Sequence, residues 1–498
     1  MLHKLPLIVA TAMIYLLVET YIAFARPISV PSPEALALSK DTQALRVLAQ
    51  HQVGTLTRCE SLVLAEALAG KVAICSVFAP KDRVVTGVFL KWILTDPKAA
   101  TFINHTVVSI ENASINDTVM LEGAEVSPPV LFTDSTLTSL FVNRSVLKGG
   151  LTISKSRLSN LYFGQSQLSD LSVKDSSLSS TLSLVDSDTK SLSVSGSVLR
   201  NVDVATSTFD TVSFEKVTID CLRFSPSTVR ANLQFIDSWT KNKADFAGLK
   251  IEGQFMVDKS HFLASPDSCG TEFRDSNSDM QKSLNLEGLR YDSVGGDLRD
   301  TTAALRWLAL ELPVPFDEPS YDRLATVYED NGRHLDASKV KVAKYDRILE
   351  YDKLDTLRWA IGTFLSFTIG YGYRPFKALL FLGIVLIFGI VIFELSYRLK
   401  CMAPTDKDVF DYYKQHGTLP SHYRPFNALL YSMETLIPFI GFHQSEDWFP
   451  NAVDEGRRVV IGVRAYLWCH MILGWIIATL FLIAFTPDGP ARLNGVWR

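Results

Sequence analysis

The stretch SRLSNLYFGQSQLSDLSVKD, residues 156–175, decides the fold of the longest part of this chain. Large apolar residues recur in it every five positions, at Leu158, Phe163, Leu168 and Val173. A step of five fits neither the 3.6-residue period of an α-helix nor the two-residue period of a flat strand. It predicts a chain that turns a corner every five residues and sends one large side chain to an inner axis.

The same register continues along the chain. After a one-residue insertion that follows Leu178, the large positions are Leu184, Thr189 (the weak member), Val194, Leu199, Val204, Phe209, Phe214, Ile219 and Phe224. A second series two residues earlier alternates small and large residues: Ser156, Leu161, Ser166, Leu171, Ser176, Leu182, Ser187, Leu192, Ser197, Val202, Ser207 and Val212. We expect the large residues to fill the axis and the small ones to pack beside them.

This spacing resembles the pentapeptide-repeat family, whose fold is a right-handed quadrilateral β-helix. The match covers residues 110–262, or about seven coils if four pentapeptides form one coil. Serine stands here where the family often has alanine. The resemblance implies a rod stabilised by stacking between neighbouring coils.

The acidic residues of the repeat do not suggest an enzyme. β-Helices that cleave polysaccharides need carboxylates clustered on one outer face. Those of this chain are scattered and lie mostly at predicted corners: Asp170, Asp175, Asp186, Asp203, Asp210 and Glu215. We therefore expect no catalytic residues on the rod.

Composition limits the remaining possibilities. The chain has 498 residues, 47% apolar and 20% charged, with a net charge of −4. This length predicts two to four units, and the lack of a basic excess disfavours nucleic-acid binding. No two of the six cysteines form a CxxC pair, so we predict no metal and no cofactor.

Residues 1–25 have the pattern of a signal peptide, with Lys4 before an apolar stretch and a small-x-small site at its end. An uncleaved anchor is the alternative, because the apolar stretch is long. Both interpretations export the residues that follow. Export favours disulfides from Cys59 to Cys75 and from Cys221 to Cys269, and free buried thiols are the alternative.

Two apolar stretches near the C-terminus predict membrane-spanning helices of about 20 residues. Together with the repeat they give a mixed fold: a β-helix, a helical hairpin and a two-span α-helical membrane module. The predicted segments are an N-terminal cap region at 26–109, a linker with a short helix at 263–316, a hairpin at 317–353, an interfacial helix at 354–375, a first span at 376–396, a loop at 397–464, a second span at 465–486 and a tail at 487–498. The hairpin resembles one tetratricopeptide-like unit, which alone suits a packed spacer better than a peptide groove. The sequence GYGYRP at 370–375 has the letters of a potassium filter but precedes the span, so we read it as an interfacial turn.

From about residue 284 to 487, the order hairpin, GYGYRP, span, YRPFNALLYS, span resembles an uncharacterised family of bacterial membrane-associated pentapeptide-repeat proteins. Some of its members carry an oxidoreductase label. This chain has no GxGxxG after a strand and no flavin, haem or CxxC motif to support that label. The resemblance implies a bacterial membrane protein, and the export predicted from the N-terminal pattern leads us to expect inner-membrane spans with the β-helix in the periplasm.

The segment ALLYSMET at 428–435 resembles the pore helix of two-span potassium channels through its alanine, leucine, serine, Glu434 and Thr435. The filter that should follow is absent, because LIPFIGFHQ has Pro438, a lone Gly441 and His443 where the filter has glycines. We predict a re-entrant segment at 426–444. Basic residues between the spans outnumber those after the second one, which predicts a cytoplasmic loop and an inverted orientation relative to such channels.

Ionisable residues close to the membrane are the candidate site. Glu434, His443 and His470 could face one another or a cavity. A histidine such as His470 more often bonds a neighbouring hydroxyl or carbonyl than a metal. Gly383, Gly389 and Gly474 could allow close helix approach.

These features predict a non-enzymatic membrane protein whose β-helix is a rigid scaffold or interaction surface for a protein partner. The alternative is an oligomeric channel or transport-like module with a degenerate pore loop, gated by the β-helix. A membrane-associated oxidoreductase is the third possibility. The predicted partners are membrane lipid, an unknown protein and further copies of this chain.

Overall fold

The computed structural model describes residues 40–262, 269, 284–311, 318–351, 354–437, 439–451, 457–486 and 488–495. The predicted signal peptide at 1–25 lies outside them. The chain divides into two compact units. The first comprises Met1–Ala244, Ile251–Gly253 and Lys259–Cys269, and the second comprises Asp245–Lys250, Gln254–Asp258 and Gly270–Arg498.

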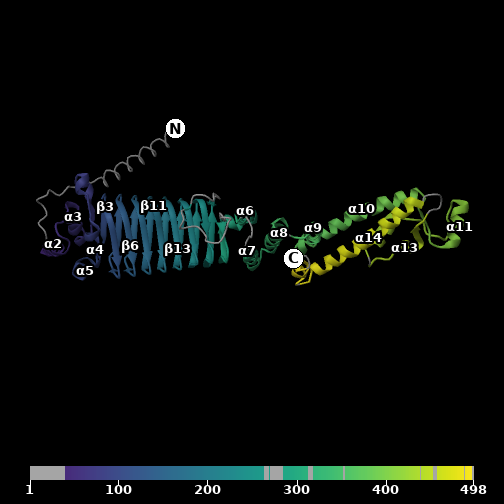
Figure 1. Ribbon diagram of the computed structural model, residues 1–498. Helices are drawn as coiled ribbons and strands as arrows, with labels where there is room; N and C mark the ends of the chain where they lie inside the picture. Colours follow the sequence, from purple (N-terminus) through teal and green to yellow (C-terminus); the bar gives the residue numbers. More distant parts are fainter. Residues whose placement is uncertain are drawn as a thin grey trace, which may run out of the picture. The chain divides into compact units, whose positions relative to one another are not determined.

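The first unit contains a β-solenoid of about seven turns. Its strands alternate between two parallel sheets and stack in rows (Figure 1). One sheet has the order β1-β2-β5-β8-β10-β12-β14-β16, with β4 and β7 paired beside β10, and the other has the order β3-β6-β9-β11-β13-β15-β17-β19. The strands are β1 (Val72–Ile74), β2 (Val108–Glu111), β3 (Ser114–Glu122), β4 (Glu125–Val126), β5 (Val130–Thr133), β6 (Thr136–Asn143), β7 (Val146–Leu147), β8 (Leu151–Ser154), β9 (Arg157–Gly164), β10 (Gln167–Lys174), β11 (Ser177–Val185), β12 (Asp188–Ser195), β13 (Val198–Ala205), β14 (Thr208–Glu215), β15 (Thr218–Ser225), β16 (Thr228–Ile236), β17 (Trp239–Asp245) and β19 (His261–Phe262).

Burial confirms the five-residue register. Every large position from Leu158 to Phe224 and every position of the second series from Ser156 to Val212 is buried. Buried positions are spaced alternately by two and three residues, and a bend with a left-handed residue follows every second inward pair, as at Lys155, Gln165 and Asp175. The insertion after Leu178 is a bulge in β11, where the register to both neighbouring strands shifts.

The interior serines have a role that their size alone does not explain. The Ser166 hydroxyl donates to the Gly164 carbonyl at 2.8 Å and accepts the Ser145 amide at 3.1 Å. The Ser166 amide in turn donates to the hydroxyl of Ser187, one turn onward, at 3.2 Å. The residue before each such serine is commonly left-handed, as at Gln165 with φ 49°. Serine therefore satisfies a buried corner amide that alanine would leave without a partner.

Helices at the N-terminal end of the first unit are α2 (Lys40–Val53), α3 (Arg58–Leu68), α4 (Gly87–Thr95) and α5 (Pro97–Ile103). The Glu60 carboxylate is buried and accepts the amides of Thr57 and Thr86 at 2.7 and 2.8 Å. Two disulfides join the pairs named from the sequence. Cys59 bonds to Cys75, and Cys221 bonds to Cys269, with Cα–Cα distances of 5.4 and 5.9 Å.

The second unit begins with β-structure that continues past residue 262, within the expected linker. Its strands β18 (Lys250–Asp258, partly in the first unit) and β21 (Arg290–Gly296) are neighbours in the sheet order. The short helix α6 (Thr301–Leu308) follows, and then the predicted hairpin, α7 (Glu318–Asp330) and α8 (His334–Tyr351). Gly332, with φ +72°, separates the two hairpin helices as expected.

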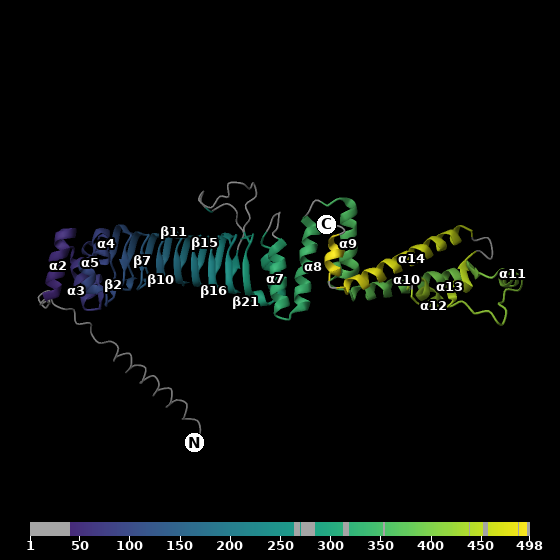
Figure 2. The ribbon, with the colours of Figure 1, turned by 90° about the horizontal axis from the view of Figure 1, so that it is seen from below.

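The remaining elements are helical, apart from one short strand pair. They are α9 (Thr356–Ile369), α10 (Lys377–Arg398), α11 (Lys407–His416), α12 (Ala428–Leu436), α13 (Gln444–Asp447), α14 (Arg457–Ala484) and α15 (Gly489–Gly495), with β22 (Met402–Pro404) antiparallel to β23 (Trp448–Pro450). In both views α10 and α14 lie side by side (Figures 1 and 2). By length and composition both are apolar enough to cross a membrane.

Candidate functional site

The segment between the two long apolar helices forms an ordered structure. The side chain of Asn427 caps α12 by accepting the Leu430 amide at 3.1 Å. α12 packs against both α10 and α14, close to α13 in Figure 2. Ser432 and Thr435, on the inner face of α12, are buried. The polar positions of this helix therefore point into protein.

A small polar centre lies where α10, α12 and α14 meet. His470 Nε2 is 3.2 Å from the Ser432 carbonyl, which can only accept, so this nitrogen carries the hydrogen. The other ring nitrogen, Nδ1, is 3.3 Å from the Tyr466 hydroxyl. The Ser432 hydroxyl donates to the Leu386 carbonyl of α10 at 3.2 Å. Both ring nitrogens of His470 thus have hydrogen-bond partners within the protein.

Two of the three predicted glycines make the close approach possible. A Cβ at Gly389 would lie 2.1 Å from the Ser432 hydroxyl oxygen, and one at Gly474 would lie 1.9 Å from the Leu436 carbonyl oxygen. Gly383 has nothing within 4 Å of that position, so the expectation was wrong for this glycine. It lies on a part of α10 that α12 does not reach at close range.

These contacts place the C-terminal end of α12 near the middle of the two apolar helices. Ser432 meets α10 at Leu386, well inside Lys377–Arg398, and Leu436 meets α14 at Gly474. Farther along the chain, the Phe439 ring lies 6.3 Å from that of Trp475. α12 thus runs alongside α10 and α14 as far as about their middle, and the chain then leads back to α13.

The structure does not bring Glu434, His443 and His470 together. The Glu434 carboxylate accepts the Gln444 amide at 2.8 Å and the Ser445 hydroxyl at 2.9 Å, which ties α12 to α13. His443 is exposed, left-handed with φ 63°, and 3.1 Å from Glu446. Each of the three side chains therefore has hydrogen-bond partners of its own. The sequence analysis did not predict these partners.

The rest of the pore-like stretch also departs from a filter. The Thr435 hydroxyl donates to the Tyr431 carbonyl at 2.7 Å, so it turns back onto its own helix. Gly441 is exposed and nothing lies within 4 Å of its Cβ position. Pro438 lies outside the described residues.

An aromatic core that the sequence analysis missed supports this segment. Trp448 is fully buried and its indole N–H donates to the Arg424 carbonyl at 3.1 Å. Around it lie the rings of Tyr397, Tyr413, Tyr423 and Phe426. The high density of aromatic residues between 393 and 449 could have indicated this core. Their spacing follows no helical or strand period, so the sequence did not show which of them pack together.

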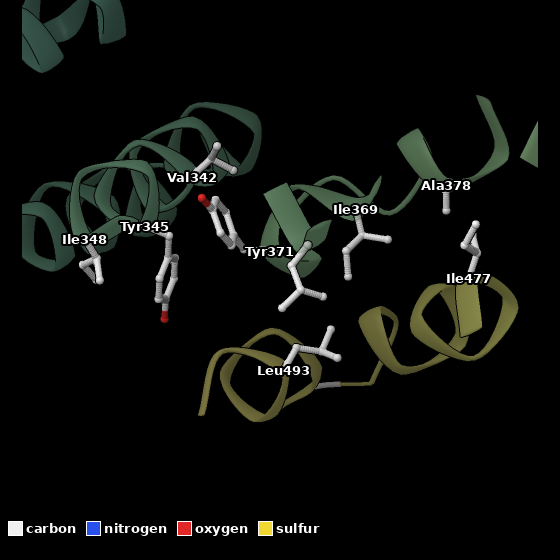
Figure 3. Packing of buried hydrophobic residues seen from close by; sticks show 9 residues of the cluster. Val342, Tyr345, Ile348, Ile369, Tyr371, Ala378, Ile477 and Leu493 are labelled. Carbon is white, nitrogen blue, oxygen red and sulfur yellow. The ribbon is translucent and has the colours of Figure 1, made fainter. Parts of the chain in front are cut away.

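A second centre forms around the GYGYRP turn. Tyr371 is fully buried, and its hydroxyl donates to Asp346 at 2.8 Å. Figure 3 shows Tyr371 in one buried cluster with residues of α8, α9, α10, α14 and α15. Burial is the first cause that raises the pKa of Tyr371, and the contact with Asp346 adds to it. The turn is a packed junction, whereas the sequence suggested only an interfacial segment.

Several of the acidic side chains on the solenoid are paired or at corners, whereas Asp170 lies within β10. Arg223 donates to both carboxylate oxygens of Asp203, at 2.6 and 2.7 Å, and Arg230 donates to Asp210 at 2.9 Å. Asp175 and Asp186 occupy left-handed corner positions. Across the described ranges, no group of three His, Cys, Asp or Glu residues is placed to hold a metal ion.

Comparison of the chain with known proteins finds no matching family model, no matching curated protein and no matching solved structure.

Proposed function

We propose that this chain is a membrane-anchored, non-enzymatic protein. In this proposal α10 and α14 span the inner membrane of a bacterium, and the β-solenoid is a rigid periplasmic surface for a protein partner. The spacing of its inward residues supports a pentapeptide-type β-helix. The exposure of the two long apolar helices carries the proposal.

A soluble protein would bury helices of this composition in its core. Only 17% of the apolar window of α10 and 22% of that of α14 are buried. Leu380, Phe388 and Ile461 are 70%, 62% and 63% exposed. Lipid would cover this surface, whereas water would meet a large apolar patch.

Two independent features support the assignment of sides. The disulfides belong to the first unit, and structural disulfides persist in oxidising compartments. Basic residues gather between α10 and α14 and at the ends of these helices that adjoin that segment, which favours the cytoplasmic side for it. They are Arg398, Lys400, Lys407, Lys414, Arg424, Arg457, Arg458 and Arg464.

In this arrangement α12 is re-entrant from the cytoplasmic side. Its contacts at Leu386 and Gly474, near the middle of α10 and α14, support a position of its C-terminal end near the bilayer centre if these helices span. Nine helical residues rise about 13 Å, close to half of an apolar layer of about 30 Å. Non-helical backbone at that depth must be covered by protein or water, and in the single chain Phe439 and Gly441 of the returning segment are exposed.

The deciding experiment fuses a periplasm-active and a cytoplasm-active reporter after residues 262, 410 and 498. We expect periplasmic activity at 262 and 498 and cytoplasmic activity at 410. The reverse pattern would overturn the sides and place α12 in the orientation of a channel pore helix. Cytoplasmic activity at all three positions would overturn the membrane proposal itself.

The position of α12 between α10 and α14 favours one second candidate, an oligomeric channel gated by the solenoid. Two helices cannot enclose a pore, so conduction would need several copies. Planar-bilayer recording of the purified protein separates the two candidates. If the protein is a channel, we expect currents that change in the variants Glu434→Gln or His443→Ala. If it is a scaffold, we expect no currents.

A further inference from the structure

The turn between α9 and α10 has an uncommon backbone. Gly370, Tyr371 and Gly372 are all left-handed, with φ of 54°, 56° and 88°. Glycine adopts these angles freely, but a bulky residue such as tyrosine is an outlier there. Such a residue persists only where its surroundings hold it in place.

Two side chains from distant parts of the chain hold Tyr371. Its hydroxyl donates to Asp346 of α8 at 2.8 Å, and its carbonyl accepts the Asn494 amide of α15 at 3.1 Å. Asn494 is itself buried and also donates to the Pro490 carbonyl. One holder precedes both long apolar helices in the sequence, and the other follows them.

α15 lies close against the turn. A Cβ at Gly372 would lie 3.1 Å from Pro490 and 3.2 Å from Leu493. On the other side, the Tyr371 ring lies 5.3 Å from that of Tyr345. The turn therefore joins α8 before the helix pair to α15 after it.

We propose that Gly370–Gly372 is a latched joint. Asp346 and Asn494 keep Tyr371 in its strained conformation, and this holds α8, the start of α10 and α15 in one arrangement. Loss of either contact lets Tyr371 relax out of the left-handed region, and α8 and α15 then separate from the turn together. This goes beyond anchoring, because it makes the attachment of the hairpin to the helix pair switchable.

Ordinary packing would predict something different. If the two contacts were independent, removal of one would loosen only its own neighbour. A latched joint is reciprocal, because both contacts stabilise the same strained state. The distinction can be measured without knowledge of a partner.

The test is hydrogen exchange of the full chain in detergent, with Tyr371→Phe and Asn494→Ala singly and together. We expect each single variant to accelerate exchange of the same three regions, the turn, the second half of α8 and α15, by about five- to tenfold, as for the loss of one buried hydrogen bond. Reporter amides in the turn are those of Tyr373 and Arg374, which donate to Gly370 and Ile369. Because both contacts stabilise the same closed state, the double variant should accelerate exchange in all three regions by about the product of the two single effects.

Asn331→Ala is the matched control, because its amide also donates to a backbone carbonyl, that of Val327 at 2.7 Å, away from the joint. It should leave the turn unchanged. Faster exchange confined to α8 in Tyr371→Phe and to α15 in Asn494→Ala, or no change in either variant, would overturn the joint. If Asn494→Ala does not fold, Tyr371→Phe alone decides, since it must accelerate α15. The topology reporters test the proposed function separately.

Discussion

At the scale of single residues, the corner serines show how the solenoid satisfies the backbone amides at its bends. Each such amide donates to a serine hydroxyl of the next turn, as the Ser145 amide does to Ser166. Ser166→Ala would leave the buried amide of Ser145 without the hydroxyl that it now reaches at 3.1 Å. We expect a loss of about 1–3 kcal/mol in the free energy of unfolding, the cost of an unsatisfied buried donor. Thermal unfolding of the purified protein, followed by circular dichroism, measures it.

The same solenoid offers a matched control. The Ser172 hydroxyl is buried and has no hydrogen-bond partner among the described residues. Ser172→Ala removes the same atom but strands no donor, so stability should stay equal or rise slightly. Equal losses for the two variants would show that serine size, and not its hydrogen bonding, matters at the corner.

Asp336 gives the hairpin a pH dependence. Hydrogen bonds with Lys339, Thr301 and Arg333 lower its pKa from 3.8 to about 2. A lowered pKa contributes stability that is present above the ordinary value and is lost as the pH falls through about 2. Asp336→Asn should therefore cost about 1 kcal/mol at neutral pH, since the group is partly exposed. The difference in unfolding midpoint from wild type should shrink between pH 5 and pH 2, and a constant difference would contradict the assignment.

At the scale of elements, the crossing of α10, α12 and α14 depends on missing side chains. A Cβ at Gly389 would lie 2.1 Å from the Ser432 hydroxyl oxygen and 2.7 Å from His470 Cε1. Gly389→Ala should therefore destabilise the detergent-solubilised protein by about 1–3 kcal/mol, the range for overpacking. Gly383→Ala is its control on the same helix, and with open space around it should be neutral or mildly stabilising. Similar melting points for both variants would argue against the close crossing.

Elements also show which features the sequence could predict. The solenoid interior was predictable because the environment of a residue there depends on its place in a five-residue period, as at Leu161 and Phe163. The surroundings of Tyr371 were not predictable, because they include Asn494, 123 positions away, which donates to its carbonyl. The surroundings of Trp448 likewise come from separate segments. The predicted re-entrant segment was local in sequence, but the partners of Glu434 and His470 were set by packing.

At the scale of the whole molecule, thiol chemistry connects the fold to its compartment. Four cysteines are paired in the first unit, while Cys401 is free and buried and Cys469 is free and exposed. The pair Cys221–Cys269 closes a loop of 48 residues, for which chain entropy predicts about 4 kcal/mol of stabilisation. Such a bond should form wherever the solenoid meets an oxidising environment.

Protein from the membrane fraction, denatured without reductant and labelled with a heavy maleimide, should therefore take up two labels per chain, at Cys401 and Cys469. Prior reduction should raise the number to all six cysteines of the chain, which serves as the control for access. Six labels without reduction would mean that the solenoid stays in a reducing compartment. That outcome would remove the support that the disulfides give to export, while the anchoring by α10 and α14 would still depend on the reporter fusions. Two labels would show that both disulfides form in the cell, and therefore that the first unit meets an oxidising environment.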